Sequence, residues 1–303
     1  MKKLKKILYL LGVMMTGFLI SACVQELRHA PPPVMAKQSV SATTYLAPVV
    51  HIYHADHVNK ARLSPNTPMS QNFVINGFDQ VLITGNVSGT VNGGQSQNQL
   101  VVNGTIESLK NFSARTKGGI LYISSSEPVN ISLNLANPVR ELANNGNGNI
   151  EMKNIANKSM KLGFGGNSVT NLRGDLVLSR IDLSGNARLS AYWVDSSNLH
   201  VVTQNQSKLF LAGVVTNLDV IATDNAEIDA KYLRADNAYV RTADNADVGV
   251  TVNRSLSTLS TDRSTVYYYD NSRVGLHYLD SHGSALRMKG IPNQSIYKQP
   301  YGQ

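Results

Sequence analysis

The sequence predicts an all-β fold of the parallel β-helix, or solenoid, type, with turns of about 20 residues. Two observations lead to this prediction. From Phe73 onward, short runs rich in Val, Ile and Leu alternate with Gly, Asn and Asp, and none of these runs has the period of a helix. In the second half of the chain, one residue pattern recurs every 18 to 20 residues. A turn of this length cannot bury its apolar side alone, so it must pack on the turns above and below it.

The repeat can be followed from one anchor residue in each turn: Asn147, Gly166, Asn186, Gln206, Asn225, Asn245, Arg263 and Gly283. Three positions after each anchor the residue is aliphatic: Ile150, Val169, Leu189, Leu209, Ile228, Val248, Val266 and Leu286. The residue directly after each anchor is small, and the residue between these two positions varies. Because alternate residues of a strand point to opposite faces, the small and aliphatic columns are predicted to point inward and the variable column outward.

A second inward set is predicted before the next anchor in three turns: Leu199 and Val201, Leu218 and Val220, and Ala238 and Val240. If the stack ran evenly from Phe73 to Gly290, it would contain about eleven turns. At about 4.8 Å per turn it would be about 50 Å long.

The first 22 residues have the pattern of a secretory signal peptide, with four lysines followed by an uncharged apolar run that is too short to cross a bilayer. The segment from Ile20 to Cys23 resembles the bacterial lipobox. That resemblance implies cleavage between Ala22 and Cys23, acylation of Cys23 with palmitate-type chains, and, since Val24 is not Asp, sorting to the outer membrane. The lipid-anchored protein would face the periplasm or the cell surface.

The predicted organisation has four parts: the signal peptide 1–22, a lipidated and flexible Pro-rich tether 23–72, the β-helix 73–290, and a C-terminal tail or cap 291–303. After cleavage, 24 basic residues face 20 acidic ones, and the net charge falls from +8 to about +4. This mild charge argues against nucleic-acid binding. Cys23 is the only cysteine, so its lipidation leaves no thiol for catalysis, zinc or disulfides.

Several strand and glycine patterns resemble a known family, the putative autotransporter adhesin, head GIN domain. They are the run from Phe78 to Gly85, the run Leu121-Tyr122-Ile123, the run from Val129 to Leu133, Pro138, and the stretch from Asn145 to Ile150. The resemblance covers about residues 73 to 290. It implies a right-handed β-helix on an exported protein, and it supplies no functional residues to carry over.

Three sets of residues are candidates for binding chemistry. Asp224, Asp244 and Asp262 would stack one turn apart, where the carboxylates could hold Ca²⁺, form a glycosidase-like or lyase-like acid cluster, or point into water as turn residues. His51, His54 and His57 could share a metal ion if their segment were helical. Tyr267 and Tyr269 are predicted to face outward, where they could stack on a sugar or a partner protein.

No nucleotide-binding or hydrolase motif occurs in the sequence, so we expect no catalytic residues and no cofactor. The function predicted is that of a membrane-anchored envelope lipoprotein whose non-catalytic β-helix serves adhesion or envelope interactions. Its partners would be the membrane, through the lipid, and an envelope polysaccharide or a host or cell-surface protein. Two alternatives stay open: a carbohydrate-binding or carbohydrate-cleaving β-helix protein, and a self-assembling structural envelope protein.

Overall fold

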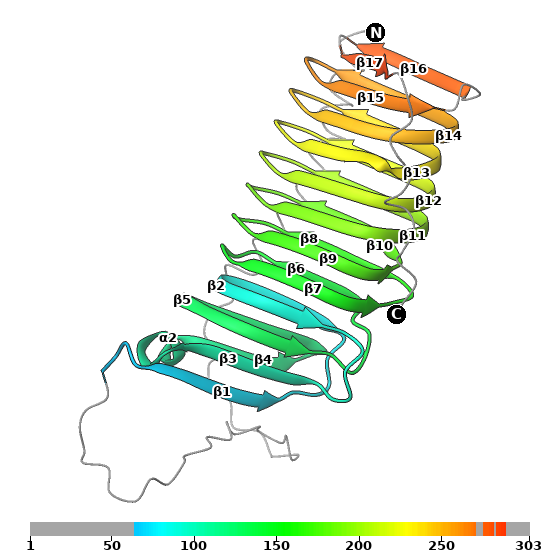
Figure 1. Ribbon diagram of the computed structural model, residues 1–303. Helices are drawn as coiled ribbons and strands as arrows, with labels where there is room; N and C mark the ends of the chain where they lie inside the picture. The colour runs from blue at the N-terminus through cyan, green and yellow to red at the C-terminus, as the bar shows by residue number, and fades with distance from the viewer. Residues whose placement is uncertain (1–63, 271–274, 282, 289–303) are drawn as a thin grey trace, which may run out of the picture. The chain divides into compact units, whose positions relative to one another are not determined.

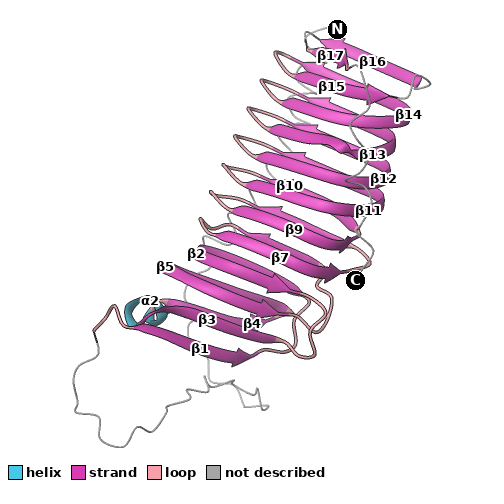
Figure 2. Ribbon diagram, viewed as in Figure 1, coloured by secondary structure: helices cyan, strands magenta, loops and turns pink. Residues whose placement is uncertain are grey.

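The structure is a computed structural model that describes residues 64–270, 275–281 and 283–288. Within these residues the chain is nearly all strand, as Figure 2 shows, with 17 strands joined in one sheet system and one short helix. The strands stack in parallel as a β-solenoid of about seven turns (Figure 1). The predicted fold class is therefore confirmed.

The regular turns begin at β6 and continue to the last described strand. Their strands are β6 (Glu141–Asn144), β7 (Asn149–Ala156), β8 (Met160–Phe164), β9 (Val169–Leu176), β10 (Leu178–Leu183), β11 (Arg188–Thr203), β12 (Lys208–Ala222), β13 (Glu227–Thr242), β14 (Asp247–Thr261), β15 (Thr265–Asp270), β16 (Gly275–Ser281) and β17 (Ser284–Arg287). Each strand pairs in parallel with its counterpart in the next turn, so that Leu209 stands opposite both Leu189 and Ile228. Like residues thus stack along the solenoid, as the repeat predicts.

The first part of the described chain departs from this regular stack. Its elements are β1 (Pro68–Val74), β2 (Gln80–Asn92), β3 (Gln99–Thr105), α2 (Ile106–Lys110), β4 (Phe112–Lys117) and β5 (Ile120–Asn134). The pairs β1–β3, β3–β5 and β4–β5 are antiparallel. The prediction of about eleven even turns from Phe73 is therefore wrong.

The glycine pair between β4 and β5 explains part of this departure. Gly118 and Gly119 have φ values of 60° and 80°, and Lys117 stands opposite Ile120 across the turn. Two central residues with positive φ form a two-residue hairpin turn whose twist matches that of antiparallel strands. The chain therefore reverses here instead of continuing around the solenoid.

Strand β2 lies between elements that follow it in the sequence. It pairs in parallel with β5 on one side and with β6 and β7 on the other, as Figure 1 shows. Gln80 stands opposite both Ile120 and Glu141. Three segments far apart in the chain are consequently brought together at the start of β2.

The core is a continuous column of buried aliphatic side chains inside the turns. Leu189, Leu209, Ile228, Val248 and Val266 are each at most 2% exposed, which confirms most of the predicted inward column. The second inward set is also buried: Leu199, Val201, Leu218, Val220, Ala238 and Val240.

At two places in the predicted inward column, the inward residue is the neighbour of the one predicted. The pairing places Thr170 opposite Ile150 and Leu189, and Thr170 is 1% exposed, whereas Val169 is only half-buried. At the other end Ala285 stands opposite Val266, and Leu286 is 47% exposed. In a strand, a shift of one residue moves a side chain to the opposite face.

The error at Val169 comes from the turn that precedes β9. Gly166 has a φ of 63° and occupies the left-handed position, and Asn167, not Gly166, takes the anchor position. The Asn167 side chain donates to Asn147 Oδ1 at 3.2 Å and accepts from Asn186 Nδ2 at 2.8 Å. From Gly166 to Asp244, the left-handed residue of each turn is followed by a residue with a side-chain amide, and this pair marks the register of the turn.

Strand β1 begins at Pro68, inside the segment that the sequence assigned to the tether. Proline is tolerated at the first residue of a strand, particularly at an edge, and β1 pairs with β3 alone.

The helix α2 was also not predicted. It is held by a capping box in which Ser108 N donates to Thr105 Oγ1 at 3.1 Å and Thr105 N donates to Ser108 Oγ at 2.8 Å.

Candidate functional site

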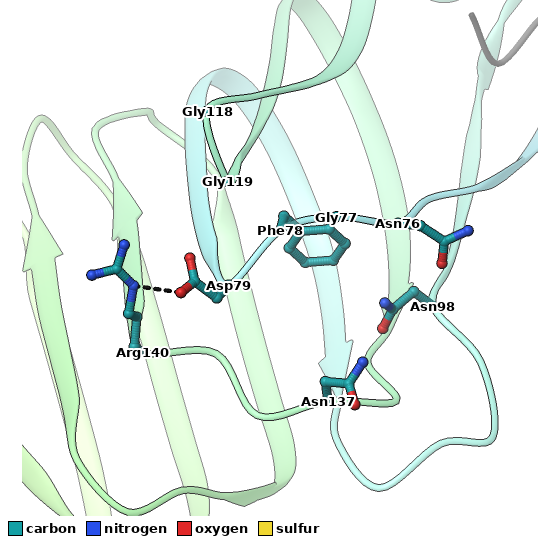
Figure 3. Close-up of a pocket in the computed structure, with 9 residues that line it drawn as sticks. All are labelled: Asn76, Gly77, Phe78, Asp79, Asn98, Gly118, Gly119, Asn137 and Arg140. Carbon is teal, nitrogen blue, oxygen red and sulfur yellow. Dashed lines mark ion pairs between the residues drawn. The ribbon is translucent and has the colours of Figure 1, made fainter. Parts of the chain in front are cut away.

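A shallow, open recess of about 490 Å³ lies where the antiparallel strands meet the first regular turns. Figure 3 shows the residues that line it: Asn76, Gly77, Phe78, Asp79, Asn98, Gly118, Gly119, Asn137 and Arg140. They come from the segment before β2, the residue before β3, the hairpin turn between β4 and β5, and the loop between β5 and β6. Four separate segments thus converge on one site.

Backbone hydrogen bonds join the walls of the recess. The Gly119 carbonyl accepts from Asp79 N at 3.0 Å and from Gln80 N at 3.2 Å, and Arg140 N donates to the Asp79 carbonyl at 2.8 Å. On the opposite side, Ala136 N donates to Asn98 Oδ1 at 2.8 Å. These bonds connect the four segments to one another, so the walls of the recess are held by hydrogen bonds in the absence of a ligand.

The lining of the recess is polar apart from one aromatic ring. Phe78 is half-buried and packs against the core, and Figure 3 shows its ring with the amides of Asn76, Asn98 and Asn137 around it. Beside the ring, Arg140 Nε and Asp79 Oδ2 form an ion pair at 2.6 Å, with side chains 62% and 50% exposed. The two formal charges of the recess therefore compensate each other.

An aromatic ladder lies on the outward face of β11, β12 and β13. The ring centroids of Tyr192 and Phe210 are 5.2 Å apart, and those of Phe210 and Tyr232 are 5.9 Å apart. Arg173 stands over Tyr192 at 5.4 Å, and Lys231 stands over Tyr232 at 5.1 Å. These rings thus contact one another, and two of them also contact a cation.

Lys231 is also held by an acid of its own strand. Its Nζ lies 2.8 Å from Asp229 Oδ2, and the hydrogen bond to Asp229 raises the pKa of the Lys231 ammonium above its usual value. The side chain that covers the Tyr232 ring is therefore cationic at neutral pH.

Asparagine ladders run along the turns. In one ladder, Asn147 donates to Asn86 and Asn167 to Asn147, both at 3.2 Å, and further on Asn245 donates to Asn225 at 3.1 Å. A second ladder joins Asn198, Asn217 and Asn237.

A shallow groove of about 430 Å³ follows the first ladder. Arg188 and Lys208 also line this groove, and Lys208 forms an ion pair with Glu227.

The predicted aspartate column exists, and its residues occupy the left-handed position of successive turns. Asp224, Asp244 and Asp262 have φ values of 62°, 61° and 59° and are exposed. The Asp224 carboxylate accepts from Asn205 N at 2.9 Å, and the Asp244 carboxylate accepts from Asp224 N at 3.1 Å. These bonds run from one turn to the next and give the carboxylates a structural role.

The other sequence candidates have different outcomes. Tyr268 is 8% exposed and points inward, while Tyr267 and Tyr269 are half-buried, so the predicted alternation is present. Ala22, Cys23, His51, His54 and His57, and the tail 291–303, lie outside the described residues.

Within the residues that the structure describes, no three His, Cys, Asp or Glu side chains gather in a way that could hold a metal ion. Nor does any helix in this part of the chain have the length and apolarity needed to cross a membrane.

The sequence did not single out the residues of the recess. In the sequence, the pair Gly118-Gly119 indicates a turn and no binding site, and Phe78 and Asp79 belong to the run that resembles the family. No spacing rule connects Asp79 with Asn98 and Arg140, because their proximity depends on β2 pairing with β5 and β6. The glycine pair at a hairpin position was the one local signal available.

Comparison with known families gives a match. The family described as "putative auto-transporter adhesin, head GIN domain" matches residues 77–272, which include most of the recess and nearly all of the solenoid. The comparison with curated proteins gives no match.

Solved structures share the fold. A putative adhesin from Parabacteroides distasonis has a TM-score of 0.66 at 12% identity, over 74% of this chain and 98% of that one. A putative adhesin from Parabacteroides merdae has a TM-score of 0.64 at 13% identity, over 73% of this chain and 96% of that one. A putative lipid binding protein from P. distasonis has a TM-score of 0.63 at 15% identity, over 72% and 96%. At these identities the likeness concerns the fold alone.

Proposed function

The chain belongs to the head GIN domain family of putative auto-transporter adhesins, and from this membership we propose that it is a non-catalytic, lipid-anchored envelope protein whose solenoid makes adhesive contacts. The adhesin description of the family supports a location in the envelope or at the surface. The Cys23 motif supports attachment of this chain to the outer membrane by lipid.

The observation that carries the non-catalytic part of the proposal is the chemistry of the recess. Glycoside hydrolysis uses two carboxyl groups about 5 to 9.5 Å apart that flank the scissile bond. Asp79 is the one acid among the residues that line the recess, and it is engaged with Arg140. The lining therefore favours binding over cleavage.

The aspartate column supports the same conclusion. The carboxylates of Asp224 and Asp244 accept hydrogen bonds from the backbone of the preceding turn. A general acid must carry a proton and a nucleophile must face the substrate, whereas these groups hold the turns together.

The anchor is tested by replacing Cys23 with Ser and labelling cells with a palmitate analogue. We expect label on the wild-type protein in the outer-membrane fraction, and an unlabelled, unprocessed Cys23→Ser chain. Label on the variant, or an unlabelled wild-type protein in the soluble fraction, would contradict lipid anchoring.

The adhesive role is tested on intact cells that carry or lack the gene. Protease or antibody access reports whether the solenoid faces outward, and attachment to glycan-coated and protein-coated surfaces reports adhesion. We expect attachment to fall when the gene is deleted and to return with the wild-type gene. Equal attachment with and without the gene, or release of reducing sugar ends by the purified protein, would refute the proposal.

A further inference from the structure

We propose that the recess around Phe78 binds one uncharged saccharide residue of an envelope or cell-surface glycan. The apolar face of the sugar would lie on the Phe78 ring, and its hydroxyl groups would bond the surrounding amides. The inference rests on the proposed adhesive function, for which it names a ligand class and a site.

The hydrogen-bonding groups of the recess match hydroxyl groups. A side-chain amide both donates and accepts, and so does a sugar hydroxyl. The side chains of Asn76 and Asn137 are exposed and make no hydrogen bond within the described part of the chain, so both functions of each amide are available. Asn98 is 8% exposed, and its Oδ1 is already taken by Ala136 N, which holds the amide in position.

The charge of the recess argues for an uncharged ligand. The Arg140 guanidinium would bind a phosphate or a uronic acid strongly if it were free, but it is paired with Asp79 at 2.6 Å. An anion that bonded the remaining N–H groups of the guanidinium would lie beside the Asp79 carboxylate, whose charge repels it. A neutral ring can instead bond the outer edges of both partners, which are about half exposed.

The Phe78 ring is placed to stack on a sugar, whereas the rings of the ladder on β11, β12 and β13 contact one another. The rings of Tyr192 and Tyr232 lie under cations, and the Phe210 ring packs between them. Phe78 has no aromatic or cationic partner within the described residues, and it lies in a recess of about 490 Å³, within the usual range for small-ligand sites. Contact with one ring face would add to the bonds made by the amides.

The test measures binding to the full-length protein by saturation-transfer NMR and calorimetry. The probes are the methyl glycosides of glucose, galactose, mannose and N-acetylglucosamine, with galacturonate and inorganic phosphate as charged comparators. We expect at least one neutral glycoside to bind with a dissociation constant in the millimolar range or tighter and to contact Phe78, and the charged probes to bind more weakly. No binding by any neutral glycoside, or stronger binding by phosphate, would overturn the inference.

Variants assign the binding to the recess. Phe78→Leu keeps an apolar side chain against the core, and Asn137→Ala changes an exposed residue, so both variants should fold; thermal unfolding checks this. We expect each to weaken glycoside binding about three- to tenfold. Phe210→Leu and Asn130→Ala are matched controls on other surfaces and should bind like wild type. Unchanged binding by the recess variants, or equal loss in the controls, would refute the site.

A cell assay separates this inference from the proposed function. If Asn137→Ala weakens glycoside binding and reduces attachment to a glycan-coated surface, both are supported. If attachment depends on the gene but neither Asn137→Ala nor Phe78→Leu changes it, the recess is not the adhesive site, and the proposed function stands. If the purified wild-type protein binds glycosides through the recess but deletion of the gene leaves attachment unchanged, the recess is supported and the adhesive function fails.

Discussion

Replacing Asp244 tests whether the aspartate column holds the turns together or holds a cation. Asp244 has a φ of 61°, and its carboxylate accepts a hydrogen bond from Asp224 N at 3.1 Å. We predict that Asp244→Ala destabilises the solenoid clearly, that Asp244→Asn is nearly neutral, and that Asp244→Gly lies between them.

The magnitudes follow from the two roles of the side chain. Loss of one exposed hydrogen bond costs about 1 kcal/mol. Holding Ala in the left-handed region costs roughly 1 kcal/mol more than holding Asp or Asn there. Asp244→Ala should therefore lose about 2 kcal/mol, which lowers the midpoint of thermal unfolding by about 4 to 8 °C for a domain of this size. Asn keeps an oxygen acceptor and tolerates the left-handed region, so its loss should be below about 0.5 kcal/mol.

The assay is thermal and urea unfolding of the three variants, each with millimolar calcium and with a chelator. If Ca²⁺ sat between Asp224, Asp244 and Asp262, the chelator would destabilise the wild type, and Asp244→Asn would be nearly as harmful as Asp244→Ala because the amide lacks the charge that binds the ion. A calcium-dependent midpoint together with an Asn variant as unstable as the Ala variant would refute the turn role.

Three further predictions concern register, close packing and pH. Thr170→Lys should destabilise the protein by about 3 kcal/mol or more, because Thr170 is 1% exposed. Val169 is only half-buried, so Val169→Lys should change the stability by less than about 1 kcal/mol. Equal losses in urea unfolding would show that the register is wrong. Gly213→Ala should cost about 2 kcal/mol or more, since φ is 140° and the added Cβ would lie 2.1 Å from the Val194 carbonyl oxygen; a variant with wild-type unfolding would contradict this geometry. The pKa of Lys231 is raised in the folded protein, so its pairing with Asp229 stabilises the fold at pH values below the ordinary lysine pKa of 10.5 and is lost as the pH rises through the folded pKa. Wild type should therefore lose more stability than Lys231→Met between about pH 9 and about pH 12. Parallel losses in the two proteins would indicate no coupling.

The regular turns were the part of the fold that could be read from the sequence. Each inward strand position repeats within 18 to 20 residues, and the same column holds Leu189, Leu209 and Ile228 in successive turns. Local alternation and turn chemistry carry this information, because each turn faces a near copy of itself. The pattern failed at Val169, where Gly166 could be read either as the anchor or as the left-handed residue before it.

The start of the solenoid and the recess could not be read in this way. Nothing in the local pattern of β2 says that it lies between β5 and β6, because a strand with alternating apolar residues can pair with any partner of like pattern. The antiparallel pairs of β1, β3 and β4 likewise lack a repeat that would reveal them. The proximity of Asp79, Asn98 and Arg140 is a consequence of these pairings.

The sequence by itself therefore determined the solenoid class, the length of its turns and most of the inward columns, because these depend on residue periodicity and on contacts between equivalent positions. The tertiary structure alone decided where the stack begins and which loops meet beside Phe78, because those depend on pairing between strands that share no repeat. The repeating part of the chain builds the support, and the non-repeating part builds the recess for which we propose a ligand.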